Sequence, residues 1–307
     1  MSWGRVLRRS LTMKRFFKNI ILALTTAAVL LVVWHLFWGR LVPFSGMFIG
    51  FKDVGSEQVI VFFHDDREEA RAVAALARSL LPEAALTLGI LRGRTVEIVL
   101  CKTEEEYRRF TGSSTRFVTI DGRIFVSPRA MADAKSGVIH LRAYLAHELA
   151  HAILAQNRSV TALLRFPAWL DEGLATSAAG QIGLDGYFDE DAVCAWVREG
   201  RAVTPSDYVR HGSHAASIAA LPENDRYHFL YSEFALFVRD LMEQGGRGRF
   251  LGYLEEVNKG ADWREAFVRT YSAAPDEALA EVLARICAED SAKAKPHGAK
   301  KGRFPGL

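Results

Sequence analysis

The chain has 307 residues, half of them hydrophobic, which is enough for one large or two small domains with a sizeable core. Its formal charge of +3 hides an uneven distribution, because twelve of the 39 Lys and Arg residues lie in 1–40 and 291–307. This leaves 27 basic residues against 36 acidic ones between those two ranges. A body this acidic excludes nucleic acid as an expected partner.

An uncharged apolar stretch lies near the N-terminus. Residues 19–39 contain no Lys, Arg, Asp or Glu, and 20–38 could cross a bilayer core of about 30 Å as a helix. Six basic residues precede the stretch, so the positive-inside rule places 1–18 in the cytoplasm and the body outside it, in the periplasm or extracellular space. A cleaved signal peptide would have a shorter apolar core and a small-residue cleavage site. We therefore expect 19–39 to be an uncleaved, single-pass membrane anchor.

The segment after the anchor predicts a small α/β layer. Residues 40–56 contain several glycines and are expected to form a linker. The runs 58–63 and 95–100 are rich in β-branched residues and predict buried strands. Two further strands, 117–120 and 124–126, flank Asp121-Gly122, which is a strong hairpin signal. Capping boxes at Asp66/Glu69 and Thr103/Glu106 predict helices over 67–81 and 104–110.

From about residue 140 the pattern becomes helical. The predicted helices are 138–156, 168–180, 189–199, 226–244, 247–258, 262–270 and 276–288. Residues 200–225 are expected to form a loop, and the Lys-rich 291–307 a disordered basic tail. The predicted fold class is α+β, with a small mixed β-sheet layer followed by a mainly helical subdomain, all within 57–290.

The three cysteines, Cys101, Cys194 and Cys287, are far apart in the sequence. An odd and sparse count does not indicate a disulfide framework, so buried free thiols are the expectation. One pair could still form a bridge if the body is exported.

Five consecutive residues, His147-Glu148-Leu149-Ala150-His151, predict a metal site. Histidines four residues apart project from one face of a helix and can bind the same ion. Leu149, with leucines or isoleucine every four residues, forms a separate apolar stripe toward the core. Glu148 can then reach a water molecule on the ion.

A catalytic zinc site with two histidines needs a third protein ligand and an open position for water. The segment 167–175 offers Glu172, twenty residues after His151, on a helix that can return antiparallel. In that arrangement Gly173 would let this helix approach the histidine helix. Taken alone, Asp171 and Glu172 could instead be a solvated helix start.

The combination of H-E-L-A-H and W-L-D-E-G-L-A resembles the gluzincins, the thermolysin-type, peptidase-MA-like zinc metallopeptidases. The resemblance covers roughly 57–290 and implies a zincin-like fold. It also implies one Zn²⁺ bound by His147, His151 and Glu172, with Glu148 as general base. The segment 231–241 resembles a later helix of the family, which suggests Tyr231 as the residue that stabilises the oxyanion.

Two departures from the family pattern stand in this sequence. Thr176 occupies the position where the family has an acidic residue that orients a ligand histidine, so Asp171 would have to take that role. Tyr231 could equally be a core tyrosine, in which case Tyr227 or His228 could replace it. No exopeptidase motif is evident.

Three further histidines have weaker readings. We expect His140 to be partly exposed, and His211 and His214 to lie in a loop without a metal.

The sequence therefore predicts a membrane-anchored zinc peptidase that hydrolyses a peptide or protein substrate outside the cytoplasm. The alternative is a zinc-binding scaffold of the same fold without turnover, against which the intact Glu148 counts.

Overall fold

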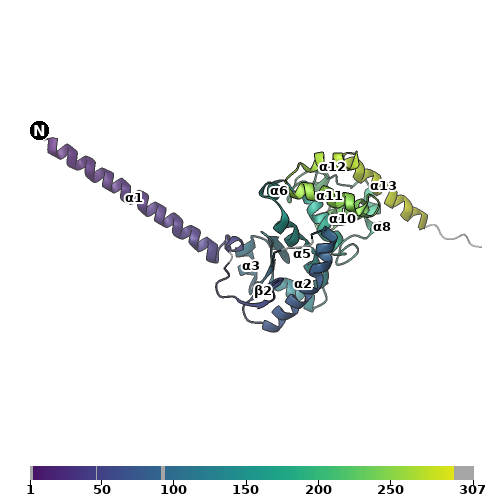
Figure 1. Cartoon of the computed structure of the whole chain (residues 1–307), viewed down its shortest axis with the longest axis horizontal. Helices are drawn as coiled ribbons and strands as arrows, with labels where there is room; N and C mark the ends of the chain where they lie inside the picture. The colour runs from purple at the N-terminus through teal and green to yellow at the C-terminus, as the bar shows by residue number, and fades with distance from the viewer. Residues whose placement is uncertain (1–2, 46, 91–93, 294–307) are drawn as a thin grey trace, which may run out of the picture.

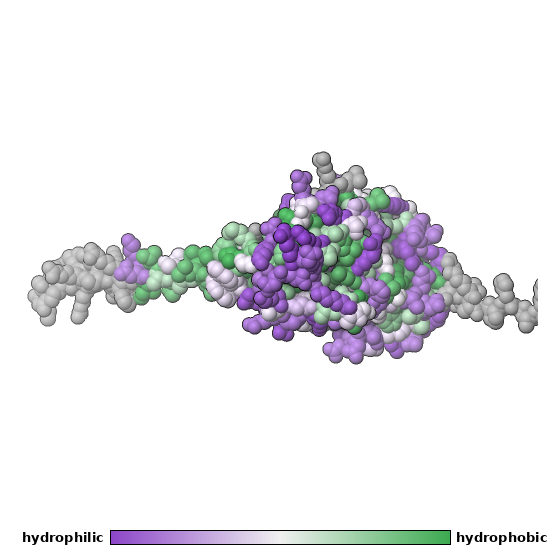
Figure 2. All heavy atoms as spheres, turned by 90° about the horizontal axis from the view of Figure 1, so that it is seen from below, coloured by the Kyte–Doolittle hydropathy of each residue, from purple (hydrophilic) through white to green (hydrophobic). Residues whose placement is uncertain are grey.

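The computed structural model of the chain describes residues 3–45, 47–90 and 94–293. A long helix, α1 (Trp3–Trp38), projects from one side of a rounded body (Figure 1). Its apolar part, Lys18–Trp38, is long enough to cross a membrane, and none of it is buried in the body. Figure 2 shows this stretch as a hydrophobic stalk beside a body whose surface is largely hydrophilic. One apolar helix of this kind could be a membrane anchor or a signal sequence.

The first half of the body contains one five-stranded mixed sheet. The strands are β1 (Lys52–Gly55), β2 (Val59–Phe63), β3 (Val96–Leu100), β4 (Phe117–Ile120) and β5 (Arg123–Val126). Their spatial order is β1-β2-β3-β5-β4, with parallel pairs in the centre and antiparallel pairs at both edges. Strand β4 is thus an edge strand, and this position matters for the site described below.

Helices cover this sheet and make up the rest of the body. They are α2 (Arg67–Leu88), α3 (Glu104–Thr111), α4 (Pro128–Lys135), α5 (Leu141–Asn157), α6 (Val160–Arg165), α7 (Ala168–Ala178), α8 (Glu190–Arg198), α9 (Ala216–Ala219), α10 (Arg226–Glu243), α11 (Arg247–Asn258), α12 (Trp263–Tyr271) and α13 (Pro275–Lys293). Helices α2 and α5 pack on the sheet, and α7 packs between α5 and α10. The α+β class is confirmed, with the sheet first and helices after it.

The β4–β5 hairpin has the predicted turn. Asp121 and Gly122 both have positive φ angles, 52° and 75°, as a two-residue turn between twisted strands requires. Both predicted helix caps are also present, because Asp66 accepts a hydrogen bond from the Glu69 N–H and Thr103 accepts one from the Glu106 N–H.

The sequence prediction was wrong for parts of the chain. Residues 40–56 are more than a linker, because they contain a 3₁₀ turn, η1 (Val42–Phe44), and the edge strand β1. Helix α2 continues past Pro82 to Leu88, and α4, α6 and α9 were not predicted. Most of the predicted tail, 294–307, lies outside the described residues, while 291–293 belong to α13.

The expectation of free thiols was wrong for two of the three cysteines. Cys194 on α8 and Cys287 on α13 form a disulfide, with their Cα atoms 5.3 Å apart. Cys101 is a buried free thiol, as expected. The pairing depends on α8 lying against α13, which brings together two cysteines that are 93 positions apart in the sequence. Sequence spacing alone could not reveal that contact.

Candidate metal centre

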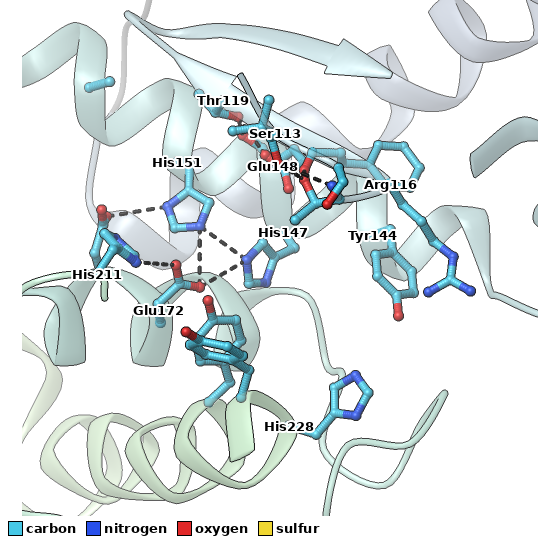
Figure 3. Close-up of a pocket in the computed structure, with 18 of the residues that line it drawn as sticks. Ser113, Arg116, Thr119, Tyr144, His147, Glu148, His151, Glu172, His211 and His228 are labelled. Atoms are coloured by element: carbon cyan, nitrogen blue, oxygen red, sulfur yellow. Dashed lines mark hydrogen bonds and ion pairs between the residues drawn. The ribbon is translucent and has the colours of Figure 1, made fainter. Parts of the chain in front are cut away.

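Helix α5 supplies both histidines because its opposite face is fixed in the core. Leu145 and Leu149 are fully buried, and Ile153 is nearly so, as the apolar stripe predicts. Leu141, at the start of the stripe, is only partly buried. His147 and His151 consequently project together from another face of the helix, with Glu148 beside them (Figure 3).

Helix α7 supplies Glu172, and the reason for Gly173 differs from the prediction. A Cβ atom at Gly173 would lie 2.7 Å from the Phe234 carbonyl oxygen, which belongs to α10. The glycine therefore permits the close approach of α7 to α10 rather than to the histidine helix. Trp169 of the same segment is fully buried, as predicted. Together these contacts fix the helix that carries Glu172.

His147, His151 and Glu172 form one compact group of potential ligands. Each offers one donor atom, and these atoms lie within 4.8 Å of one another. The two histidine Nε2 atoms are 3.0 Å apart, and Glu172 Oε2 is 3.2 Å from that of His147 and 3.5 Å from that of His151. Figure 3 shows the three side chains pointing at one another from α5 and α7. This group could hold a metal ion.

The outer nitrogen of each histidine has its own partner. His151 Nδ1 lies 3.3 Å from Asp171 Oδ1, and His147 Nδ1 lies 2.7 Å from Gln181 Oε1. Both oxygens can only accept, so Nδ1 donates and the Nε2 lone pairs remain available to a metal. Asp171 thus contacts His151 as the expected orienting role requires. Gln181, just beyond α7, was not predicted.

The environment of the Glu172 carboxylate also supports a cation at this position. Glu172 Oε2 is buried, and its neighbours are the two histidine Nε2 atoms, which cannot donate a hydrogen bond to it when Nδ1 carries the proton of each neutral ring. A buried carboxylate oxygen without a donor is costly unless a cation satisfies it. The position between the two Nε2 atoms and this oxygen is therefore where an ion would satisfy all three.

The charges around the group favour a cation. Burial would raise the pKa of Asp171 and of Glu172, but neighbouring charges, chiefly Arg158 for Asp171 and His151 for Glu172, hold both pKa values well below their usual range. Burial would likewise lower the pKa of His151, but the two carboxylates outweigh it and raise that pKa well above its usual range. Both carboxylates thus stay ionised despite their burial, and Glu172 can offer a charged oxygen to a cation.

Comparison of the sequence with models of known protein families gives no match, and comparison with curated proteins gives none either.

Glu148 is positioned by the sheet. Thr119 Oγ1, on the edge strand β4, donates a hydrogen bond of 2.6 Å to Glu148 Oε2. Glu148 is 8 % exposed and lines the same cavity as the three potential ligands. One carboxylate oxygen is therefore held by β4, which fixes the side chain beside the histidines (Figure 3). Thr119 carries no motif that would have identified it in the sequence.

Tyr231, on α10, lies against the group of potential ligands. Its ring stacks on that of His147, with centroids 6.2 Å apart and planes inclined by 24°. Burial, followed by the charge of Glu172, raises the pKa of Tyr231 well above its usual value. The hydroxyl thus keeps its proton and can donate a hydrogen bond. Tyr227 and His228 line the same cavity one turn earlier.

The group opens into a cavity of about 750 Å³ bordered by β4, α5, α7 and α10. His211, from the loop 200–225, also lines it, and its Nδ1 lies 3.5 Å from Glu172 Oε1. The sequence placed His211 in a loop but gave no reason to bring it to the site. At the opposite end of the cavity stand Arg116 and His228 (Figure 3).

His140 and His214 do not line this cavity. His140 is exposed and pairs with Asp185, at 2.6 Å between Nδ1 and Oδ1. The expectation of a partly exposed His140 is thus confirmed.

Proposed function

We propose that the protein is a membrane-anchored zinc peptidase on a zincin-like fold, related to the gluzincins, with its catalytic body outside the cytoplasm. The observation that carries this proposal is the convergence of His147, His151 and Glu172 beside Glu148, in a cavity bordered by an edge strand. Two imidazoles and one carboxylate are the ligand set of a catalytic zinc, and they leave one position open for water. A zinc ion held there would act as a Lewis acid on that water and on the scissile carbonyl.

The residues of the chain divide the remaining work. Glu148, held by Thr119, takes the proton from the attacking water and delivers it to the leaving amine. Tyr231 keeps its proton and donates a hydrogen bond to the oxygen on which negative charge develops. An extended peptide can pair with the free edge of β4, which would place its backbone alongside Glu148. The position of each side chain in the cavity supports the role proposed for it.

Two features support the proposed location. Helix α1 has an excess of basic residues on its N-terminal side, which favours a cytoplasmic N-terminus. The Cys194–Cys287 disulfide is typical of proteins that fold in an oxidising compartment, outside the cytoplasm. Both features support a body outside the cytoplasm.

The deciding experiment compares the full chain with its Glu148→Gln variant. Metal content is measured by elemental analysis of protein that has not met a chelator, and hydrolysis is measured on a mixed peptide library. We expect equimolar zinc in both proteins and a rate about 10²–10⁴-fold lower in the variant, the usual contribution of a general base. Glu105→Gln, at an exposed site on α3, is the matched control and should leave the rate unchanged.

Two outcomes would contradict the proposal. Cleavage that persists in Glu148→Gln would exclude the mechanism. Equimolar metal without cleavage of any peptide by the unmodified chain would favour the zinc-binding scaffold instead.

A further inference from the structure

The large apolar side chains of helix α6 face outward, away from the protein core. Val160, Leu163 and Leu164 are 78 %, 49 % and 78 % exposed, whereas the small Ala162 is buried. A surface helix ordinarily places its large apolar side chains toward the core. Three adjacent exposed ones therefore indicate contact with something outside the described body.

A second group of exposed apolar residues follows α1. Phe44, Met47 and Ile49 are 56 %, 56 % and 50 % exposed. Val42 and Phe48 in the same segment are buried, in a cluster with residues of β3, α3 and β5. The segment is therefore fixed on the body, and its outward side chains hold a defined place on the surface.

Contacts within the body bring the two groups to one end of it. The Arg123 guanidinium donates a hydrogen bond to the Pro43 carbonyl, which ties η1 to the β4–β5 hairpin. Gly122, in the turn of that hairpin, lies against the Gln156 side chain in the last turn of α5. Helix α6 begins four residues later. The two groups thus flank the same hairpin turn, and Figure 1 shows α6 on the side of the body from which α1 projects.

We propose that this apolar rim, made of Phe44, Met47, Ile49, Val160, Leu163 and Leu164, enters the interfacial layer of the lipid bilayer that α1 crosses. The inference rests on the proposed anchoring by α1. The first half of the rim follows the end of the apolar helix within a few residues, so it lies at the membrane surface wherever α1 spans. The second half shares that end of the body and meets the same surface.

The charges beside the rim suit a lipid surface. Arg40 and Arg165 are exposed, and each adjoins one half of the rim in the sequence. Bases at this depth attract anionic headgroups, while apolar side chains reach the boundary of the acyl chains. Asp121, in the hairpin turn, is an exposed acid that opposes this attraction. A second copy of the chain or a soluble partner would have no such continuity with α1.

Docking would also orient the cavity. Helix α6 lies in the connection between α5 and α7, the two helices that carry the potential ligands. Arg158, at the start of that connection, lines the cavity and pairs with Asp171. A bilayer contact at α6 would hold the cavity at a fixed height above the membrane surface.

The test uses the full chain in lipid nanodiscs that contain brominated phospholipids, which quench a nearby fluorophore. Single cysteines are introduced by Leu164→Cys, Phe44→Cys and Val138→Cys, and each is labelled with the same environment-sensitive fluorophore. Val138 is the matched control. It is 57 % exposed, but it lies just before the N-terminal end of α5, whereas α6 follows the C-terminal end. Labelling of the unmodified chain measures any background from Cys101, which is buried.

We expect lipid-dependent loss of fluorescence at positions 44 and 164 and none at position 138. Leu163→Asp is then combined with each labelled cysteine in turn. It should abolish the quenching of the label at position 164 and leave the quenching of the label at position 44 unchanged.

Three results would overturn the proposal. If position 44 is quenched and position 164 is not, the anchor stands and the docking fails. If neither is quenched, the proposed anchoring fails as well. If position 164 is shielded without lipid, in a manner that depends on protein concentration, a second copy covers the rim.

Discussion

Helices α5 and α6 follow each other in the chain and distribute their apolar residues in opposite ways. Helix α5 buries Leu145 and Leu149 and turns its histidines into a cavity, whereas α6 buries Ala162 and exposes its leucines. The first pattern is complete within the folded body, because Leu145, Leu149 and Ile153 are buried and Leu141 packs against the same core. The second is incomplete without an apolar surface outside it. Two consecutive helices can therefore place their apolar residues in opposite ways, one toward the protein core and the other away from it.

The largest expected difference is in stability. Leu149→Ala removes a fully buried side chain from α5 and should lower the free energy of unfolding by about 2–5 kcal/mol. Leu164→Ala on α6 should change it by less than ~0.5 kcal/mol, since the side chain is exposed. Urea denaturation followed by tryptophan fluorescence measures both. Equal losses at the two positions would contradict the contrast between the helices.

A second expected difference concerns the polar face of α5. Gln181→Ala removes the acceptor that orients His147, and such a change typically lowers metal affinity about 10–100-fold. Gln156→Ala is the control. Gln156 lies on α5, like His147, but it donates a hydrogen bond to the Thr95 carbonyl, so its loss should leave the metal affinity unchanged. Competition with a chromogenic chelator measures both variants. Unchanged affinity in Gln181→Ala would show that the Gln181 contact does not matter to the centre.

The smallest expected effect tests how α6 is held. Ser159 caps the helix, with its Oγ accepting a hydrogen bond from the Ala162 N–H at 3.1 Å. Ser159→Ala should lower the free energy of unfolding by about 1 kcal/mol, the usual loss for an N-cap. Ser136→Ala, at the exposed end of α4, should lower it much less, because that hydroxyl caps no helix N-terminus. If thermal denaturation shows equal shifts for both, α6 is not held by its cap.

The sequence predicted the part of the centre whose residues are close together in the chain. His147, Glu148 and His151 share one helix, and helical spacing alone brings them to one side. Glu172 could be added because a tryptophan and a glycine mark its helix. The close pairing of the β4–β5 hairpin likewise followed from two adjacent residues, Asp121 and Gly122.

What the sequence could not show depends on contacts between distant segments. Thr119 and Gln181 become partners of Glu148 and His147 only when β4 and the end of α7 pack against α5. His211 reaches Glu172 from a loop without periodicity. The residues of strand β1 are almost all exposed, so its sequence lacks the alternation of apolar and polar residues that would have predicted a strand. Helix α6 was missed for a related reason, because its apolar side chains face outward.

The Cys194–Cys287 disulfide has a consequence for how the chain is made. It closes a span of 93 positions that contains α9 through α12, while α5 and α7 come before it. The bridge cannot form until Cys287 has left the ribosome, so α9 through α12 are all made before it can close. The histidines and Glu172 emerge long before that point. The potential metal ligands are therefore made first, and the disulfide that joins α8 to α13 forms last.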